Sequence, residues 1–214
     1  MIKIKYNTNV YNFAEYISSW LGDVELSKLH EIKQYEHFDR EHDQSTMWHK
    51  KFYKMIRENS EFNDMYCCFL EEFIKPRYNE VIVYQKIPTF RVHLPGNVSV
   101  GEYHKDKYYR NVKWAEQVKE TNYYLPLTKA YNTNTLWAET EEDKGDYRPF
   151  NAVYGDLIEW DASNLMHGNK DNEEDDTRVS IDFRVIPKSR YINSDHLTIN
   201  TKIPFGIGGY YEEI

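Results

Sequence analysis

The chain has 214 residues and a formal net charge of −8, with 40% hydrophobic and 29% charged residues. This length and composition suit one globular domain, residues 1–214, with a core of ordinary size. A chain this acidic lacks the clustered Lys and Arg that bind nucleic acid, so we expect no nucleic-acid partner. No apolar run approaches the ~18 residues that a membrane span needs, and the N-terminus has no signal-peptide core. We therefore expect a cytoplasmic protein with no membrane partner; its oligomeric state is not indicated.

Residues 1–80 form a mainly helical N-terminal part in our interpretation. Apolar residues recur at helical spacing over 10–21, and Gly22 can end that helix. A second helix is expected to begin with Ser45 as its N-cap, and a third to stop at Pro76. The third helix contains the two cysteines, which are adjacent and therefore offer neither a disulfide framework nor metal-type spacing. We expect them to be buried, reduced thiols.

The sequence pattern changes in residues 81–187, where β-branched and aromatic residues alternate with polar ones. This pattern predicts a mainly β fold with flanking helices, built as a sandwich or barrel. The strand candidates are 80–94, 98–104, 121–128, 135–140, 156–161 and 178–186. Two acidic segments, 139–146 and 171–176, are expected to be solvated loops. The tail, 188–214, is predicted to be irregular.

The segment GEYHKD places His104 and Asp106 two residues apart. On a strand both side chains would leave the same face, with attachment points roughly 6–7 Å apart, so that one metal ion could bind both. His167, far along the chain, could complete a facial set of three ligands. Two His and one carboxylate with open positions are typical of non-haem Fe(II) oxygenases. The alternative is three unrelated polar residues on sheet edges and loops.

A second group of polar residues lies on the strand candidate RVSIDFRV. There Arg178, Ser180, Asp182 and Arg184 would share one face, with hydrophobic residues on the other. A planar guanidinium can hold a carboxylate through two parallel hydrogen bonds, and Ser180 could add a hydroxyl contact. Arg184 competes with Arg178 for this role. The alternative for Arg178 is a surface salt bridge with the acidic loop that precedes it.

Together these blocks resemble the Fe(II)/2-oxoglutarate-dependent oxygenases, in particular the phytanoyl-CoA hydroxylase-like branch. The similarity runs over residues 85–187, through FRVHLPG, GEYHKD, NYYLPLT, NTLW, GDLIEWD, HGN and RVSIDFR. A subgroup associated with streptomycin biosynthesis is especially similar. The resemblance implies a double-stranded β-helix over 81–187, a cupin-like jelly-roll of two facing sheets buttressed by helices.

The resemblance also implies roles for particular residues. His104, Asp106 and His167 become the catalytic iron ligands, Arg178 binds the C5 carboxylate of 2-oxoglutarate, and Ser180 assists it. Relatives that halogenate have a small residue in place of the carboxylate, whereas Asp106 is present here. The implied reaction is therefore hydroxylation of a small molecule with O2 and 2-oxoglutarate, releasing succinate and CO2.

Four further residues are candidates on weaker grounds. Asn122 and Tyr124 lie on a probable inward-facing strand and could touch the cosubstrate, although ordinary packing explains them equally well. By strand parity, Glu102 would point with His104 towards the metal and could read a positive or polar group of the substrate. Its alternative is an internal salt bridge with Arg91. The similarity to the streptomycin-associated subgroup and the acidic segments 139–146 and 171–176 favour an amino-, guanidino- or sugar-like substrate.

The remaining candidates are expected to be structural. Trp137 and His93 are interpreted as core residues. Surface or packing roles are expected for His30, His37, His42, His49 and His196. Two other functions remain open: a cupin-type metalloprotein that acts as an isomerase or hydrolase, and a jelly-roll binding module. Neither needs an arginine placed to bind a dicarboxylate.

Overall fold

The computed structural model describes residues 1–33, 44–99, 102–194, 196–198 and 202–214. The described helices are α1 (Phe13–Leu21), α2 (Leu29–Ile32), α3 (Met47–Glu58), α4 (Ser60–Phe69) and α5 (Val112–Val118). The described strands are β1 (Ile2–Lys5), β2 (Ile82–Gln85), β3 (Thr89–His93), β4 (Thr121–Pro126), β5 (Leu136–Ala138), β6 (Arg148–Pro149), β7 (Asp156–Trp160), β8 (His167–Asn169), β9 (Arg178–Pro187) and β10 (Tyr211–Glu213).

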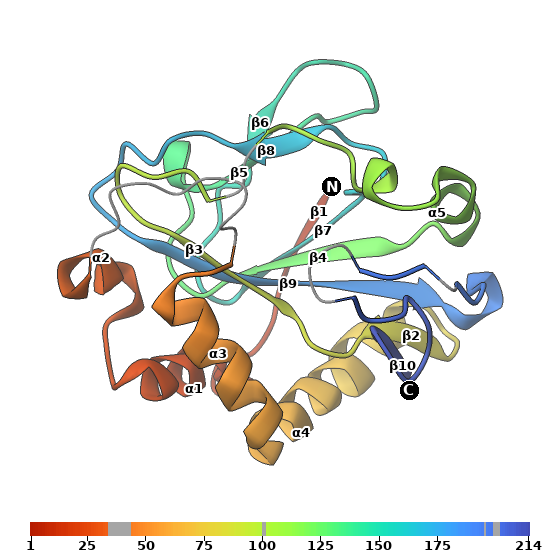
Figure 1. The fold of residues 1–214 in the computed structure, drawn as a ribbon, viewed down its shortest axis with the longest axis horizontal. Coiled ribbons are helices and arrows are strands. Elements are labelled where there is room, and N and C mark those ends of the chain that lie inside the picture. The colour runs from red at the N-terminus through yellow and green to blue at the C-terminus, as the bar shows by residue number, and fades with distance from the viewer. Residues whose placement is uncertain (34–43, 100–101, 195, 199–201) are drawn as a thin grey trace.

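The fold is mainly β, with antiparallel sheets and flanking helices, as the sequence predicts. The larger sheet has the order β1-β7-β4-β9-β2-β10, with β3 also paired to β9. The smaller sheet has the order β6-β5-β8. In Figure 1 the helices α1, α3 and α4 cover one side of the larger sheet, and the smaller sheet faces its other side. The molecule therefore has a helical layer and two sheet layers.

Strand β9 shows how the sequence pattern builds these layers. Its apolar side chains (Val179, Ile181, Phe183 and Val185) are fully buried in the core that the sheet shares with the helices. Its polar side chains alternate with them and face the smaller sheet. Because successive side chains of a strand point to opposite faces, one ten-residue strand supplies both a core and a polar interior wall.

The helix ends follow local chemistry. Gly22 closes α1 with a left-handed φ of 112°, and its N–H donates to carbonyls of the last turn. Helix α3 is capped by Thr46, whose hydroxyl accepts a backbone N–H of the first turn, so the predicted cap at Ser45 is wrong by one residue. Helix α4 continues through a π-helical turn, residues 70–74, before Pro76 enters a short 3-10 turn.

The mainly helical N-terminal part also contains β1, which was not predicted and which pairs with β7 along the edge of the larger sheet. Other predictions about elements are wrong. Segment 80–94 forms two strands, and in the described part of 98–104 there is no strand, only a bridge at His104. The tail ends in β10, which pairs with β2. Cys67 is half-buried and Cys68 is exposed, so the expected pair of buried thiols is also wrong.

Among the described residues, no helix is both long enough and apolar enough to cross a membrane.

Candidate metal centre

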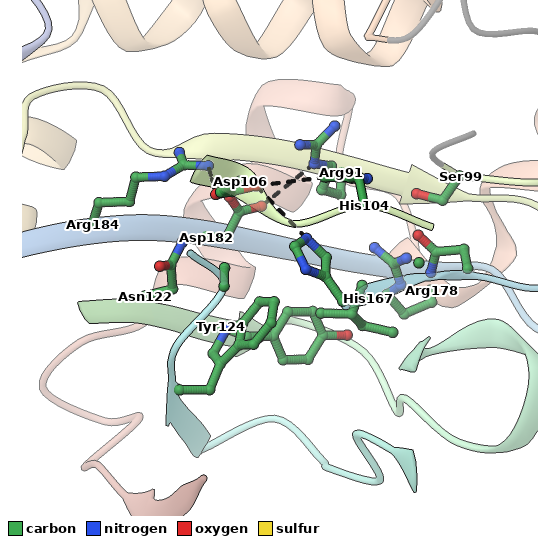
Figure 2. A pocket seen from close by; sticks show the side chains of 15 residues that line it. Arg91, Ser99, His104, Asp106, Asn122, Tyr124, His167, Arg178, Asp182 and Arg184 are labelled. Atoms are coloured by element: carbon green, nitrogen blue, oxygen red, sulfur yellow. Dashed lines mark hydrogen bonds and ion pairs between the residues drawn. The ribbon is translucent and has the colours of Figure 1, made fainter. Parts of the chain in front are cut away.

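Three side chains from distant parts of the sequence meet between the two sheets (Figure 2). The Nε2 atoms of His104 and His167 lie 3.5 and 3.7 Å from Oδ1 of Asp106. One ligand atom from each residue lies within 4.8 Å of the others. In the described part of the chain, no second group of His, Cys, Asp or Glu meets this spacing. The structure thus brings together the three residues that the sequence selects.

The backbone around the three residues differs from the expected strand. His104 and His167 exchange two backbone hydrogen bonds, of 2.8 and 3.0 Å, in an isolated antiparallel bridge. The N–H of Asp106 then donates to the carbonyl of Ala162 at 2.9 Å, and a 3-10 turn begins at that residue. The His-x-Asp segment is therefore held by the His167 segment itself, and the two ligand-bearing segments are fixed against each other.

Both histidines present the same ring nitrogen to the centre. Nδ1 of His104 lies 2.9 Å from the carbonyl oxygen of Glu102, and Nδ1 of His167 lies 2.9 Å from that of Leu165. A backbone carbonyl only accepts, so each Nδ1 carries the proton and each Nε2 offers a lone pair. Burial lowers the pKa of His167 to about 4, which keeps that imidazole neutral near pH 7.

Asp106 is buried and ionised. Burial alone would raise the pKa of its carboxyl group, but Arg184, with His104 and His167, holds that pKa well below its ordinary value. Nη2 of Arg184 donates to Oδ2 at 2.7 Å, while Oδ1 faces the two histidines. Two imidazoles and one carboxylate are a donor set that suits Fe(II), so these residues fit the metal that the sequence suggests.

A cavity opens beside the three residues, and its lining includes both of the arginines that the sequence put in competition. Figure 2 shows Arg184 next to Asp106 at the left of the view and Arg178 beyond His167 at the right. Arg184 is surrounded by polar partners: Asp106, Tyr210 and Gln85 accept from its guanidinium, and Glu120 lies 3.3 Å from its Nε.

Arg178 has a different environment. It is 2% exposed, its Nε donates to the carbonyl of Asn134 at 3.0 Å, and its Nη1 donates to the hydroxyl of Ser180 at 3.0 Å. It forms no ion pair with any residue that the structure describes, so the alternative of a salt bridge with the acidic loop is wrong. Burial lowers its pKa. A buried cation with neutral acceptors alone is costly, and an anionic ligand in the cavity would offset that cost.

The cavity wall also carries buried polar atoms that have no hydrogen-bond partner among the described residues. They are the hydroxyl groups of Ser99 and Tyr124, the indole N–H of Trp160, the Nε–H of Arg184, and the side-chain carbonyls of Asn122 and Asn169. Buried polar groups are normally satisfied, so a polar ligand is the simplest partner for them. Asn122 and Tyr124 were selected from the sequence. Ser99, Trp160 and Asn169 were missed, although the last two flank the His167 segment.

Comparison with known proteins identifies a relative that matches this chain over nearly its whole length. The streptomycin biosynthesis protein StrG of Streptomyces griseus is 32% identical over 212 residues, which cover 99% of this chain and 98% of that protein. The chain belongs to the StrG family. The expected similarity to a streptomycin-associated subgroup is confirmed, while the phytanoyl-CoA hydroxylase-like branch stays a prediction. No protein-family model matches the chain.

Solved structures are similar to this StrG-family chain only at a low level. The carbocyclase SnoK from nogalamycin biosynthesis, described as non-heme and alpha-ketoglutarate dependent, has a TM-score of 0.48 and 12% identity, over 87% of this chain and 79% of its own. AviO1 from Streptomyces viridochromogenes Tue57 has a TM-score of 0.46 and 15% identity, over 87% and 88%. TM-scores below 0.5 assign neither a fold family nor an activity.

The substrate-side prediction for the StrG-family chain needs correction. Glu102 is exposed and is not part of the described cavity lining, so the strand parity that placed it beside the metal is wrong. Arg91 does line the cavity, where its Nε lies 3.4 Å from Oδ1 of Asp182. Asp182 is therefore a carboxylate of the cavity wall, and Figure 2 shows it beside Asp106. The signal for it was present in the sequence, because Asp182 shares the polar face of β9 with Arg178 and Arg184.

The acidic segment 139–146 is a loop whose residues 140–145 are exposed, as the sequence predicts. It also contacts the ligand segment, which was not predicted. Nζ of Lys105 lies 2.6 Å from a carboxylate oxygen of Asp143, and Glu142 accepts from both Lys105 and Lys107. Lys105, which lies between His104 and Asp106 in the sequence, is 2% exposed.

The other histidines take structural places. His93 is buried with its ring nitrogens 3.0 and 2.7 Å from the carbonyls of Asn134 and Asn97, and His49 is buried in the helical layer. His30 contacts Thr177, and His196 is exposed. His37 and His42 lie outside the described residues. Trp137 is half-buried under Lys170, so its expected place in the core is wrong.

Proposed function

We propose that this StrG-family protein is a non-haem Fe(II)- and 2-oxoglutarate-dependent dioxygenase that hydroxylates a small polar molecule and releases succinate and CO2. One observation carries the proposal: a His–Asp–His set with converging ligand atoms shares a cavity with a buried arginine that has no acidic partner in the described chain. An isomerase or hydrolase on the same scaffold has no need of that arginine.

The iron would be held by Nε2 of His104, Nε2 of His167 and Oδ1 of Asp106. When bound, the iron with 2-oxoglutarate supplies the oxidising chemistry, and the protein supplies ligand geometry and orientation. The backbone carbonyls behind the two Nδ1 atoms fix both ring orientations. The low pKa of Asp106 keeps its carboxylate charged for the metal.

The cosubstrate would bind at the end of the cavity that Arg178 lines. The Arg178 guanidinium would form a charge-assisted pair with the C5 carboxylate of 2-oxoglutarate, with Ser180 fixing the orientation of the guanidinium. The hydroxyl of Tyr124 and the side-chain carbonyl of Asn122 have no other described partner and face the same cavity. They are suited to hydrogen-bond the bound molecules.

The substrate would lie near the ion pair of Arg91 and Asp182, which lines the same cavity as the ligands. This pair offers charge of both signs at a cavity wall, which suits an amino-, guanidino- or sugar-like molecule rather than an apolar one. The name of StrG, a streptomycin biosynthesis protein, supports a polar small-molecule substrate. The two facing antiparallel sheets are consistent with a double-stranded β-helix around the site.

The test is anaerobic reconstitution of the purified chain with Fe(II), followed by addition of 2-oxoglutarate and air. Succinate should form only when iron, 2-oxoglutarate and oxygen are all present, because slow turnover without substrate is expected of such a site. The His167→Ala protein is the matched blank. Tight metal binding with neither 2-oxoglutarate binding nor succinate formation would contradict the proposal and favour a metalloprotein of another activity.

A further inference from the structure

The two carboxylate oxygens of Asp106 have different surroundings. Oδ1 lies 3.5 and 3.7 Å from the Nε2 atoms of His104 and His167, on the side where the ligand atoms converge. Oδ2 instead accepts a hydrogen bond of 2.7 Å from Nη2 of Arg184. Figure 2 shows the Arg184 side chain reaching Asp106 from the side away from His167. One oxygen is therefore available to a metal and the other is occupied by the protein.

Arg184 is itself held from three directions. Its Nη1 donates to the hydroxyl of Tyr210 at 2.7 Å and to the side-chain carbonyl of Gln85 at 3.2 Å. Its Nε lies 3.3 Å from Oε1 of Glu120. Nη1 and Nη2 donate hydrogen bonds, and Nε, which has no hydrogen-bond partner among the described residues, lies at ion-pair distance from Glu120. A long side chain held in this way has few rotamers left, so its Nη2 is aimed at one point.

The second carboxylate of this network is fully buried. Glu120 forms an ion pair with Arg110, and its other oxygen accepts from the hydroxyl of Tyr211 at 2.8 Å. Two arginines thus balance two carboxylates, Asp106 and Glu120, which offsets the cost of burying four charges. Removing one member would leave an unpaired buried charge.

The network also explains why the C-terminal segment folds back onto the sheet. Tyr210 and Tyr211 belong to that segment, which is fixed by β10 pairing with β2 and by the N–H of Lys86 donating to the carbonyl of Tyr210 at 2.9 Å. Their hydroxyl groups reach Arg184 and Glu120. A continuous chain of polar contacts therefore joins the last residues of the protein to the carboxylate of the ligand set.

We propose that Arg184, held by Glu120 and Tyr210, is a positioning residue that occupies Oδ2 of Asp106 and leaves Oδ1 alone for the metal. This inference rests on the proposed function, because it requires a metal at the three ligands. With one oxygen from Asp106, the protein fills three coordination positions. A second oxygen would fill a position that the cosubstrate or dioxygen needs.

The experiment uses Co(II) as a spectroscopic probe on the metal-free, full-length protein. Arg184→Met removes the donor to Oδ2 and keeps an apolar stem, Arg184→Lys restores a donor, and Tyr210→Phe removes only one support of the guanidinium. Arg77→Met is the matched control, because Arg77 also pairs with a strand carboxylate, Glu159, but on the far side of the sheet. Co(II) affinity, the visible Co(II) spectrum and the melting temperature are measured for each.

For Arg184→Met we expect about 10- to 100-fold weaker Co(II) binding together with a changed Co(II) spectrum, because the ligand loses its fixed orientation. Arg184→Lys should recover part of the affinity and of the wild-type spectrum. Tyr210→Phe, which is the variant least at risk of misfolding, should change both in the same direction by less. Arg77→Met should keep the wild-type affinity and spectrum even if it melts earlier.

Three results would overturn the inference. An unchanged Co(II) spectrum in both Arg184→Met and Tyr210→Phe, whatever the affinity, would mean that Arg184 only supports the fold. A change of equal size in Arg77→Met would mean that the effect is general destabilisation. A wild-type protein that binds no Co(II) would overturn the proposed function, and the inference with it, whereas normal wild-type binding with unaffected variants overturns the inference alone.

Discussion

Arg178 and Arg184 lie on the same strand and face the same cavity, Arg178 buried and Arg184 half-buried, yet their surroundings are opposite. Arg184 meets two carboxylates, a tyrosine hydroxyl and an amide oxygen. Arg178 meets one backbone carbonyl and one serine hydroxyl, with no carboxylate at ion-pair distance in the described chain. A buried charge that is already balanced serves the scaffold, whereas one that is not balanced is prepared for a ligand.

This difference favours Arg178 over Arg184 for the proposed cosubstrate role, a choice that the sequence left open. Both arginines are guanidinium groups on the polar face of β9. In the sequence, Arg178 was favoured only because its distance from His167 resembles the family pattern more closely. The partners distinguish them, because a cosubstrate carboxylate would have to displace Asp106 or Glu120 to reach Arg184. At Arg178 it would displace nothing.

The largest expected effect is the loss of a metal ligand from the set that lies between the two arginines in the cavity. His104→Ala, Asp106→Ala or His167→Ala should each weaken Fe(II) binding by more than the ~100-fold that loss of an outer-shell contact costs. Each removes one of only three protein ligands. Anaerobic Fe(II) titration measures this, with Asp64→Ala, an exposed carboxylate on α4, as the control. Full iron affinity in the His167→Ala protein would remove that residue from the site.

Next in size is a direct test of the comparison itself. Arg178→Leu should keep Fe(II) or Co(II) affinity but weaken 2-oxoglutarate binding by about 2–3 kcal/mol, because a charge-assisted bidentate pair is lost. Calorimetric titration of 2-oxoglutarate into the metal-loaded protein measures this. Arg184→Leu is the paired variant, and its first effect should be on metal affinity. If the two phenotypes are exchanged, the roles assigned to the arginines are reversed.

A smaller effect should follow from the neighbour of Arg178. Ser180→Ala removes the hydroxyl that accepts from Nη1, so the guanidinium loses one of its two described contacts. We expect 2-oxoglutarate binding to weaken by about 1 kcal/mol, with unchanged metal affinity. Ser18→Ala removes a comparable hydroxyl contact in α1, far from the cavity, and serves as the control. Equal 2-oxoglutarate affinity in both variants would mean that Asn134 alone orients Arg178.

The sequence predicted the elements whose pattern is long and repetitive. Strand β9 could be predicted because ten residues alternate strictly and each face carries one kind of side chain. Strands β8 and β10 could not, since three residues carry no periodicity and their partners define them. Strand β1 was missed for a related reason: its short alternating run was not given a partner, and β7 lies far along the chain.

The ligand set was predictable from residue types, but its local geometry was not. His104 and Asp106 were expected on a strand, and the structure gives a bridge followed by a 3-10 turn because the His167 segment supplies the hydrogen-bond partners. The same limit applies to Glu102, whose direction depended on the assumed strand. Partners that lie far apart in sequence, such as Glu120 and Tyr210 around Arg184, leave no local pattern at all.

The smallest effect tests whether balanced charge matters as much near the surface as it does around Arg184. Glu142 accepts from both Lys105 and Lys107, beside the ligands, but it is half exposed.

Glu142→Gln should lower the free energy of unfolding by no more than about 1 kcal/mol, because solvent screens such pairs, and added salt should shrink the difference. Metal affinity should change less than in Arg184→Met. Urea unfolding at low and high salt measures the first effect, with Glu141→Gln as the control because Glu141 pairs, among the described residues, only with Lys144 of its own loop. A loss of metal affinity as large as that of Arg184→Met would show that the acidic loop, and not burial of a balanced charge, fixes the position of Asp106.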